Sequence, residues 1–286
     1  MRRRRFLAIS AAFAATPVLA RPRIATWRGV ALGADASLRI EGGPDPEGAL
    51  RRALDLVRRS EAMFSLYDPS SLLVRLNAAG RLDDPPAEFV ALLRLCDSLN
   101  SASGGRFDPS VQPIWRALAE DGDIAAARTR AGWERVRFGK GAVVLGAGQA
   151  LTLNGIAQGW ATDRVADALE AEGYRRALVE IGEIRALGGP WRIGIGEDGA
   201  DALTLDGTAV ATTAPWAPSL LPAGTAHVIA ADGAAPRWTA VTVEADRAAL
   251  ADGWSTALAL MPEPARLPGI RRVWLTDAEG RVRSLS

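Results

Sequence analysis

Four stretches of the chain place apolar side chains at the spacing of an α-helix. The first begins at Asp45-Pro46-Glu47, where a capping side chain, a proline and an acid together favour a helix start. The second begins at Asp84-Pro85, and two more cover residues 156–172 and 248–260. The apolar positions of the first two helices are Leu50, Ala53, Leu54, Val57, Phe89, Leu92, Leu93, Cys96 and Leu99.

Short runs rich in β-branched and aromatic residues separate these helices and predict strands. The runs are residues 136–138, 142–145, 177–181, 191–195, 239–243 and 273–276. Helices and strands do not alternate strictly, so the order favours an α+β fold over a doubly wound parallel sheet. The chain has no linker-like tract, and we interpret residues 24–286 as one unit.

The first 20 residues have the pattern of a twin-arginine export signal. Arg3-Arg4-Arg5 precede Phe6-Leu7, an alanine-rich apolar stretch follows, and Val18 and Ala20 are the small residues that a signal peptidase needs. A membrane anchor is the alternative, but the apolar stretch is short. We therefore expect export to the periplasm and cleavage after Ala20.

The amino-acid composition excludes several classes of function and of structural site. Hydrophobic residues make up 48% of the chain and charged residues 23%, which is typical of a globular protein. Four arginines lie in the predicted leader, so the rest of the chain is mildly acidic and shows no basic patch for a nucleic acid. Cys96 is the single cysteine, which excludes an internal disulfide and a cysteine zinc site.

Three features could carry chemistry. Asp252 and Thr256 lie one helical turn apart and offer the hard oxygen ligands that Mg²⁺ prefers, although an aspartate near a helix start is more often a cap. Residues 153–163 pass from a strand to a helix through two glycines, which suits a phosphate at the helix N-terminus or a simple turn. His227, the only histidine, is a candidate for proton transfer or a structural side chain.

Seven blocks, in one order along the chain, resemble the motifs of the ApbE family of flavin transferases. They are residues 64–77 (FSxYxxxSxLxxLN in the family), 104–111 (GGxFDPTV), 153–163 (LxGIAKGYAxD), 179–188 (VxIGGEIRALG), 210–213 (VATS), 227–229 (HIIDPxTG) and 252–256 (DALST).

The resemblance implies an α+β fold of mixed sheets and packed helices, with FAD in a cleft between the lobes and Mg²⁺ at its pyrophosphate. Such enzymes move the FMN half of FAD onto a threonine of an exported or membrane acceptor flavoprotein and release AMP. It implies the Ala157 carbonyl, Asp252 and Thr256 as metal ligands, and His227 and Asp252 as catalytic residues. The implied flavin and FAD contacts are Tyr67, Asn77, Asp108, Gly155, Gln158, Glu183 and Thr213.

Some positions depart from the family pattern. Gln158 stands where the family has lysine, and Ala230-Ala231-Asp232-Gly233 replaces the segment after the histidine. Glu183 could instead be a salt-bridge partner. Two other functions therefore stay open: a non-catalytic periplasmic FAD-binding assembly factor, and an FAD pyrophosphatase in which water replaces the threonine.

The leader can be tested by itself. We expect Arg3→Lys combined with Arg4→Lys to leave the uncleaved precursor in the cytoplasm, because the twin-arginine route reads both guanidinium groups. Fractionation and immunoblotting measure the distribution. Normal periplasmic accumulation of the double variant would contradict the export prediction.

Overall fold

A computed structural model describes residues 23–195, 201–262, 267 and 269–285. Its centre is an eight-stranded sheet in the order β1-β2-β6-β7-β10-β11-β12-β13, in which every neighbouring pair is antiparallel. The strands of this sheet are β1 (Ile24–Ala31), β2 (Ala34–Glu41), β6 (Ala177–Ile181), β7 (Glu183–Leu187), β10 (Ala209–Thr213), β11 (Ala240–Ala245), β12 (Ile270–Thr276) and β13 (Val282–Leu285).

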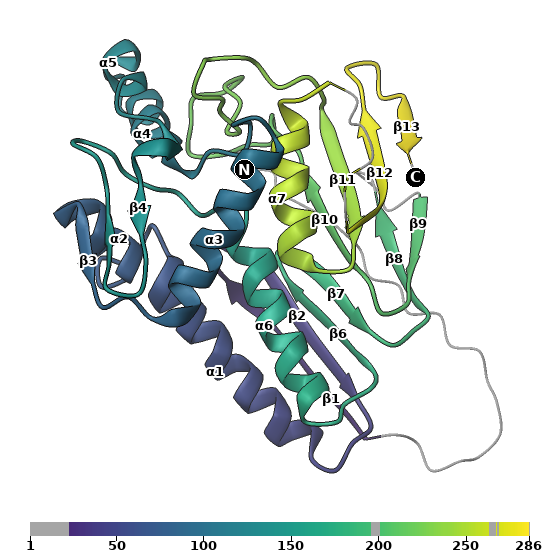
Figure 1. Cartoon of the computed structure of the whole chain (residues 1–286). Helices are drawn as coiled ribbons and strands as arrows, with labels where there is room; N and C mark the ends of the chain where they lie inside the picture. The colour runs from purple at the N-terminus through teal and green to yellow at the C-terminus, as the bar shows by residue number, and fades with distance from the viewer. Residues whose placement is uncertain (1–22, 196–200, 263–266, 268, 286) are drawn as a thin grey trace.

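Helices cover one face of this sheet (Figure 1). They are α1 (Pro46–Phe64), α6 (Ala157–Ala171) and α7 (Ala248–Ala259), with α3 (Ala87–Ala102) packed beside α7. The predicted start of α1 is confirmed, because the Asp45 side chain accepts a hydrogen bond of 3.0 Å from the Gly48 amide. Phe89, Leu92, Leu93, Cys96 and Leu99 of α3 are all buried, as their spacing predicts.

The other face of the sheet carries a two-stranded hairpin. Its strands are β8 (Trp191–Ile195) and β9 (Asp201–Leu205). Side chains along β6 alternate between the two faces, so that Ala177, Val179 and Ile181 pack with the helices while Leu178 packs with the hairpin. Burial on both faces explains why this strand reads as an almost continuous apolar run.

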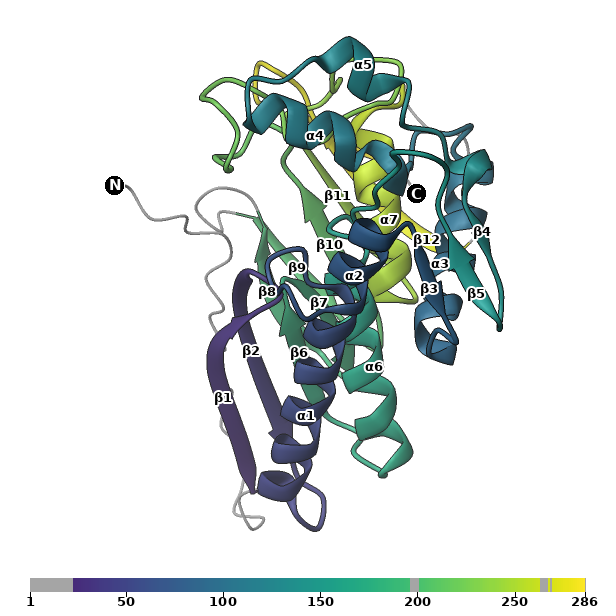
Figure 2. The same cartoon turned by 90° about the vertical axis from the view of Figure 1, so that its left-hand side faces the viewer.

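The remaining short elements lie around the helices. They are α2 (Leu72–Ala79), α4 (Gln112–Ala119), α5 (Ile124–Arg128), the 3₁₀ turns Pro109–Val111 and Trp133–Arg135, and a sheet of β3 (Arg81–Asp83), β4 (Arg137–Phe138) and β5 (Ala142–Val144). In Figure 2, α4 and α5 are at the top, β3 to β5 are beside α3, and α2 packs with α1. The predicted α+β architecture is confirmed, and most predicted helices and strands lie within a few residues of their observed bounds.

The β1–β2 hairpin is an element that the hydrophobic pattern does not predict. Its turn places Leu32 at a φ of 48° and Gly33 at a φ of 79°, a geometry that asparagine and glycine usually supply. Contacts from elsewhere hold Leu32: its amide donates to Glu61 at 3.0 Å, and its carbonyl accepts from Gln158 at 3.1 Å. Contacts with distant residues therefore stabilise this turn, which lacks the residues that usually favour such a turn locally.

The predicted leader, residues 1–20, lies outside the described residues. Within the described ranges, no helix has both the length and the apolar character needed to cross a bilayer.

Candidate functional site

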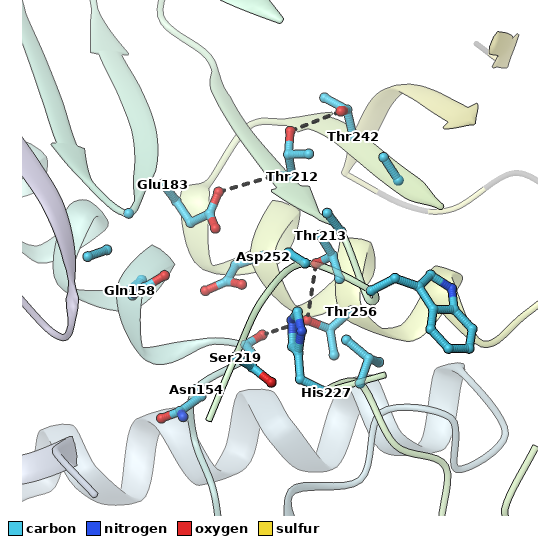
Figure 3. Close-up of a pocket in the computed structure, with 18 of the residues that line it drawn as sticks. Asn154, Gln158, Glu183, Thr212, Thr213, Ser219, His227, Thr242, Asp252 and Thr256 are labelled. Atoms are coloured by element: carbon cyan, nitrogen blue, oxygen red, sulfur yellow. Dashed lines mark hydrogen bonds between the residues drawn. The ribbon is translucent and has the colours of Figure 1, made fainter. Parts of the chain in front are cut away.

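A large cleft opens beside the main sheet, near the turn between β6 and β7. Its volume is about 2110 Å³. Segments distant in sequence line it, including the β1–β2 turn, the loop before α6, strand β10 and the long segment 214–239. Figure 3 shows Glu183, Asp252 and Gln158 around one part of this space, and His227 and Thr256 among the other side chains that line it.

The first turns of α6 and α7 meet at the floor of the cleft. Gly159 allows this contact, because a Cβ there would lie 2.4 Å from the Ala248 carbonyl oxygen. Gly155, in the loop before α6, is also confined, although less tightly: a Cβ would lie 2.8 Å from the Thr256 hydroxyl. The backbone that contains Ala157 is thus held against the helix that carries Asp252 and Thr256.

Two buried carboxylates, Asp252 and Glu183, belong to this floor. Asp252 accepts a 3.0 Å hydrogen bond from the Gly159 amide, and burial raises its pKa to about 7. Glu183 accepts a 3.2 Å bond from the Thr212 amide. Its pKa is raised well above the ordinary value, first by burial and then by the charge of Asp252.

Basic side chains compensate little of this charge. The cleft lining, as far as the chain is described, contains three arginines, of which Arg106 binds Asp232 at 2.8 Å and Arg272 binds Glu244 at 2.8 Å. The charge of Asp252 raises the pKa of Glu183, so the two carboxylates are costly when both are ionised unless a cation compensates them. A cation on these oxygens would remove that cost.

The available donors suit a hard divalent cation. Asp252 and Thr256 line the cleft and offer a carboxylate and a hydroxyl, while Ala157, which is buried and outside the lining, offers a backbone carbonyl. All three are oxygen ligands of the type that Mg²⁺ takes. Among the described residues, no group of three or more His, Cys, Asp or Glu side chains could hold an ion. A site here would therefore depend on the hydroxyl and the carbonyl, and on a ligand from the substrate.

The start of α6 is a poorer phosphate site than its sequence suggests. The amides of Ile156 and Ala157 both donate to the Leu153 carbonyl, and the Gly159 amide donates to Asp252. These first-turn donors are occupied by the protein itself, so compensation of a phosphate charge falls mainly on a cation.

Most of the other expected contacts also line the cleft, from different elements. Tyr67 is exposed at its mouth, and Gln158 and Asp108 lie in its walls, where Asp108 accepts bonds from the amide and hydroxyl of Ser110. The Thr213 hydroxyl lies 2.6 Å from the Ser255 hydroxyl, beside Thr256. His227 lines the same cleft, on segment 214–239.

Asn77 has a different place. Its side-chain amide donates to the Leu151 carbonyl at 2.8 Å and its side-chain oxygen accepts from the Leu151 amide at 2.7 Å. The residue is absent from the cleft lining. In this structure the Asn77 side chain fixes the backbone at Leu151, which leads to α6, and so supports the site without lining the cleft.

Sequence reasoning missed several lining residues. Thr212 donates to Glu183 where β10 continues beyond the end of its pairing with β7. Trp216 and Leu220 lie in segment 214–239, which has no regular secondary structure and gives no periodic signal. Blocks 210–213 and 227–229 pointed to this region, but not to Trp216 or Leu220.

Comparison with known proteins gives a consistent result. The model of the ApbE family matches residues 32–273. A search of curated protein sequences gives no match. One similar solved structure is the apo form of the flavinyl transferase ApbE from Pseudomonas stutzeri, with a TM-score of 0.81 and 24% sequence identity over 94% of this chain and 97% of that chain. The ApbE protein from Thermotoga maritima has a TM-score of 0.79 and 24% identity over 91% of this chain and 96% of that chain. The flavin transferase ApbE from Vibrio cholerae has a TM-score of 0.74 and 23% identity over 92% of this chain and 97% of that chain.

The raised pKa of Asp252 has a consequence for stability. Between pH 3.8 and about 7, folded metal-free protein keeps a proton that the unfolded chain has released, so this group's contribution to stability is lost as pH rises. We therefore expect Asp252→Asn to gain stability relative to the wild type with rising pH across that range. Urea unfolding of both proteins at about pH 5 and about pH 8 measures the difference. A difference that is independent of pH would show that Asp252 titrates normally.

Proposed function

Because this chain belongs to the ApbE family, we propose that it is a flavin transferase that moves FMN from FAD onto a threonine of an acceptor protein, with release of AMP. The observation that carries the proposal is one cleft with a pair of buried carboxylates at its floor, six of the seven expected flavin and FAD contacts in its lining, and exposed hydrophobic side chains at its mouth. The pyrophosphate of FAD is itself an anion. Its approach to Asp252 and Glu183 is favourable only if a cation or bound protons compensate the negative charges, and a cation can compensate the pyrophosphate as well.

We propose that this cation is Mg²⁺, held by the Asp252 carboxylate, the Thr256 hydroxyl and the Ala157 carbonyl. When bound, Mg²⁺ withdraws charge from the phosphate oxygens during transfer. The chain's own task is to orient the two reactants. The packing of α6 on α7 holds the first turn of α6, which contains Ala157, against the helix that carries Asp252 and Thr256. Gly155 lets the loop before α6 lie against Thr256, whose hydroxyl is 3.4 Å from the Gly155 carbonyl.

The transfer itself forms one bond and breaks one. The acceptor threonine oxygen bonds to the phosphorus of the FMN half, the bond from that phosphorus to the AMP oxygen breaks, and the threonine proton must leave. His227 is the imidazole in the cleft that can take this proton. Gln158 brings no charge and is already bonded to Leu32, so charge compensation depends more heavily on the metal.

The mouth of the cleft favours a protein acceptor over water. Among described residues, the large hydrophobic side chains that remain exposed are Ile24, Val30, Tyr67, Trp216, Leu220 and Val282, and all except Ile24 line the cleft. The cleft volume of about 2110 Å³ is roughly twice the upper range of a site for one small ligand. Exposed apolar side chains around a cleft are typical of a protein-binding surface. A pyrophosphatase would need none of them.

The N-terminal twin-arginine pattern supports a periplasmic location. We therefore propose that the acceptor is a periplasmic flavoprotein or the periplasmic part of a membrane flavoprotein.

The metal assignment can be tested by charge removal. We expect Asp252→Asn to lower FMN transfer by at least ~100-fold, because the amide keeps the size and can still accept from Gly159 but carries no charge for the metal. Co-expression with a candidate acceptor, followed by mass spectrometry for the FMN adduct, measures the rate. Asp35→Asn, an exposed carboxylate of the same cleft, is the matched control and should keep its activity. Wild-type transfer by Asp252→Asn would refute the assignment.

The acceptor surface can be tested separately. We expect Leu220→Ser to raise the KM for the acceptor by about five- to tenfold and to leave FAD affinity unchanged, because Leu220 is 70% exposed at the mouth. Ile24→Ser, which removes an exposed hydrophobic side chain outside the cleft, is the control. Loss of FAD affinity with an unchanged acceptor KM would assign this part of the mouth to FAD instead.

A further inference from the structure

Helix α7 begins without a capping side chain of its own. Its N-cap residue is Arg247, which makes no side-chain capping bond. The cap comes from helix α6: the two carboxylate oxygens of Asp163 accept hydrogen bonds from the amides of Ala248 and Ala249, each at 3.0 Å. Asp163 is only 2% exposed. A buried carboxylate of one helix thus holds the first turn of another.

Asp167, one turn further along α6, binds the same arginines without touching the backbone of α7. Arg185 lies 2.9 Å from Asp163 and 2.7 Å from Asp167, while Arg247 lies 3.3 Å from Asp163 and 2.6 Å from Asp167. Two carboxylates and two guanidinium groups balance in charge. What distinguishes Asp163 is therefore its pair of bonds to the amides of α7.

A second bond runs in the opposite direction between the same helices. Asp252 of α7 accepts from the Gly159 amide of α6, four residues before Asp163. Each helix therefore contributes one carboxylate to the backbone of the other, and the two bonds fix both the distance and the rotation of α7 against α6. Figure 1 shows the two helices one above the other in front of the sheet.

We propose that Asp163 is a positioning residue that holds α7 against α6 so that Asp252, Thr256 and the Ala157 carbonyl converge on one cation. The inference rests on the proposed function, because it assumes a divalent ion at these oxygens. Without Asp163, the first two amides of α7 lose their partners and the helix start is free to shift. The ligands on α7 then lose their alignment with the ligand on α6.

The test measures metal dependence rather than turnover. Binding of FAD to the mature protein is followed by flavin fluorescence across a Mg²⁺ titration, and hydrogen exchange of the α7 start is followed by mass spectrometry. We expect Asp163→Ala to raise the Mg²⁺ concentration for half-maximal FAD binding by about tenfold, as for other residues that orient metal ligands. Exchange at residues 248–249 should accelerate.

The matched control is Asp167→Ala, which removes the same charge from the same arginines and leaves both amide bonds in place. We expect its Mg²⁺ requirement to stay close to that of the wild type. Asp163→Asn should lie between, because its single side-chain oxygen can accept from one amide. This variant carries the test if Asp163→Ala does not fold in thermal unfolding.

Equal shifts in the Asp163 and Asp167 variants would overturn the inference, because the effect would then belong to the charge cluster. An unchanged Mg²⁺ requirement despite faster exchange at residues 248–249 would also overturn it. A wild-type protein that binds FAD equally well without any divalent ion would instead overturn the metal in the proposed function, and this inference with it.

Discussion

The close approach of α6 to α7 at Gly159 is the constraint on which the site depends. No side chain fits between the two helices there, so the backbone of one contacts the carboxylate of the other, and Asp252 is buried as a result. The charge of the buried Asp252 acts on Glu183, and the described lining of the cleft contains three arginines, of which two are bound to other carboxylates. The packing of the two helices therefore maintains a site whose negative charge favours a bound cation. A cation at this place could also stabilise the charge of a pyrophosphate during transfer.

Elements with a clear apolar pattern were predictable, because a continuous apolar run marks a strand buried on both faces and helical spacing marks the buried face of a helix. The bounds of β6 and β8 match the expected runs, and α1 begins at its predicted cap. The β1–β2 hairpin was not predictable, because Glu61 and Gln158 hold its turn from elsewhere in the chain. Asn77 is an example at the site of a role that the sequence alone did not predict. A motif position suggested a ligand contact, whereas both ends of its amide are bonded to the backbone of Leu151.

Three functions of the cleft are compatible with the sequence: a flavin transferase, an FAD-binding factor and an FAD pyrophosphatase. An FAD-binding factor and a pyrophosphatase need the buried carboxylates and a metal as much as a transferase does, so the floor of the cleft does not discriminate among them. The exposed side chains at the mouth argue against a pyrophosphatase, because Trp216 and Leu220 cost solvation free energy in the isolated protein and are explained by a protein partner, which a transferase and an assembly factor both have. Membership of the ApbE family and this surface support the same function.

The central claim is that α6 and α7 together hold a divalent cation at the pyrophosphate of FAD. Crystals grown with FAD and Mn²⁺, which substitutes for Mg²⁺ at oxygen ligands, test it directly through the anomalous scattering of the metal. We expect one strong peak at bonding distance from the Asp252 carboxylate, the Thr256 hydroxyl and the Ala157 carbonyl. Ordered FAD with no peak among these three oxygens, or with the metal bound elsewhere, would contradict the account.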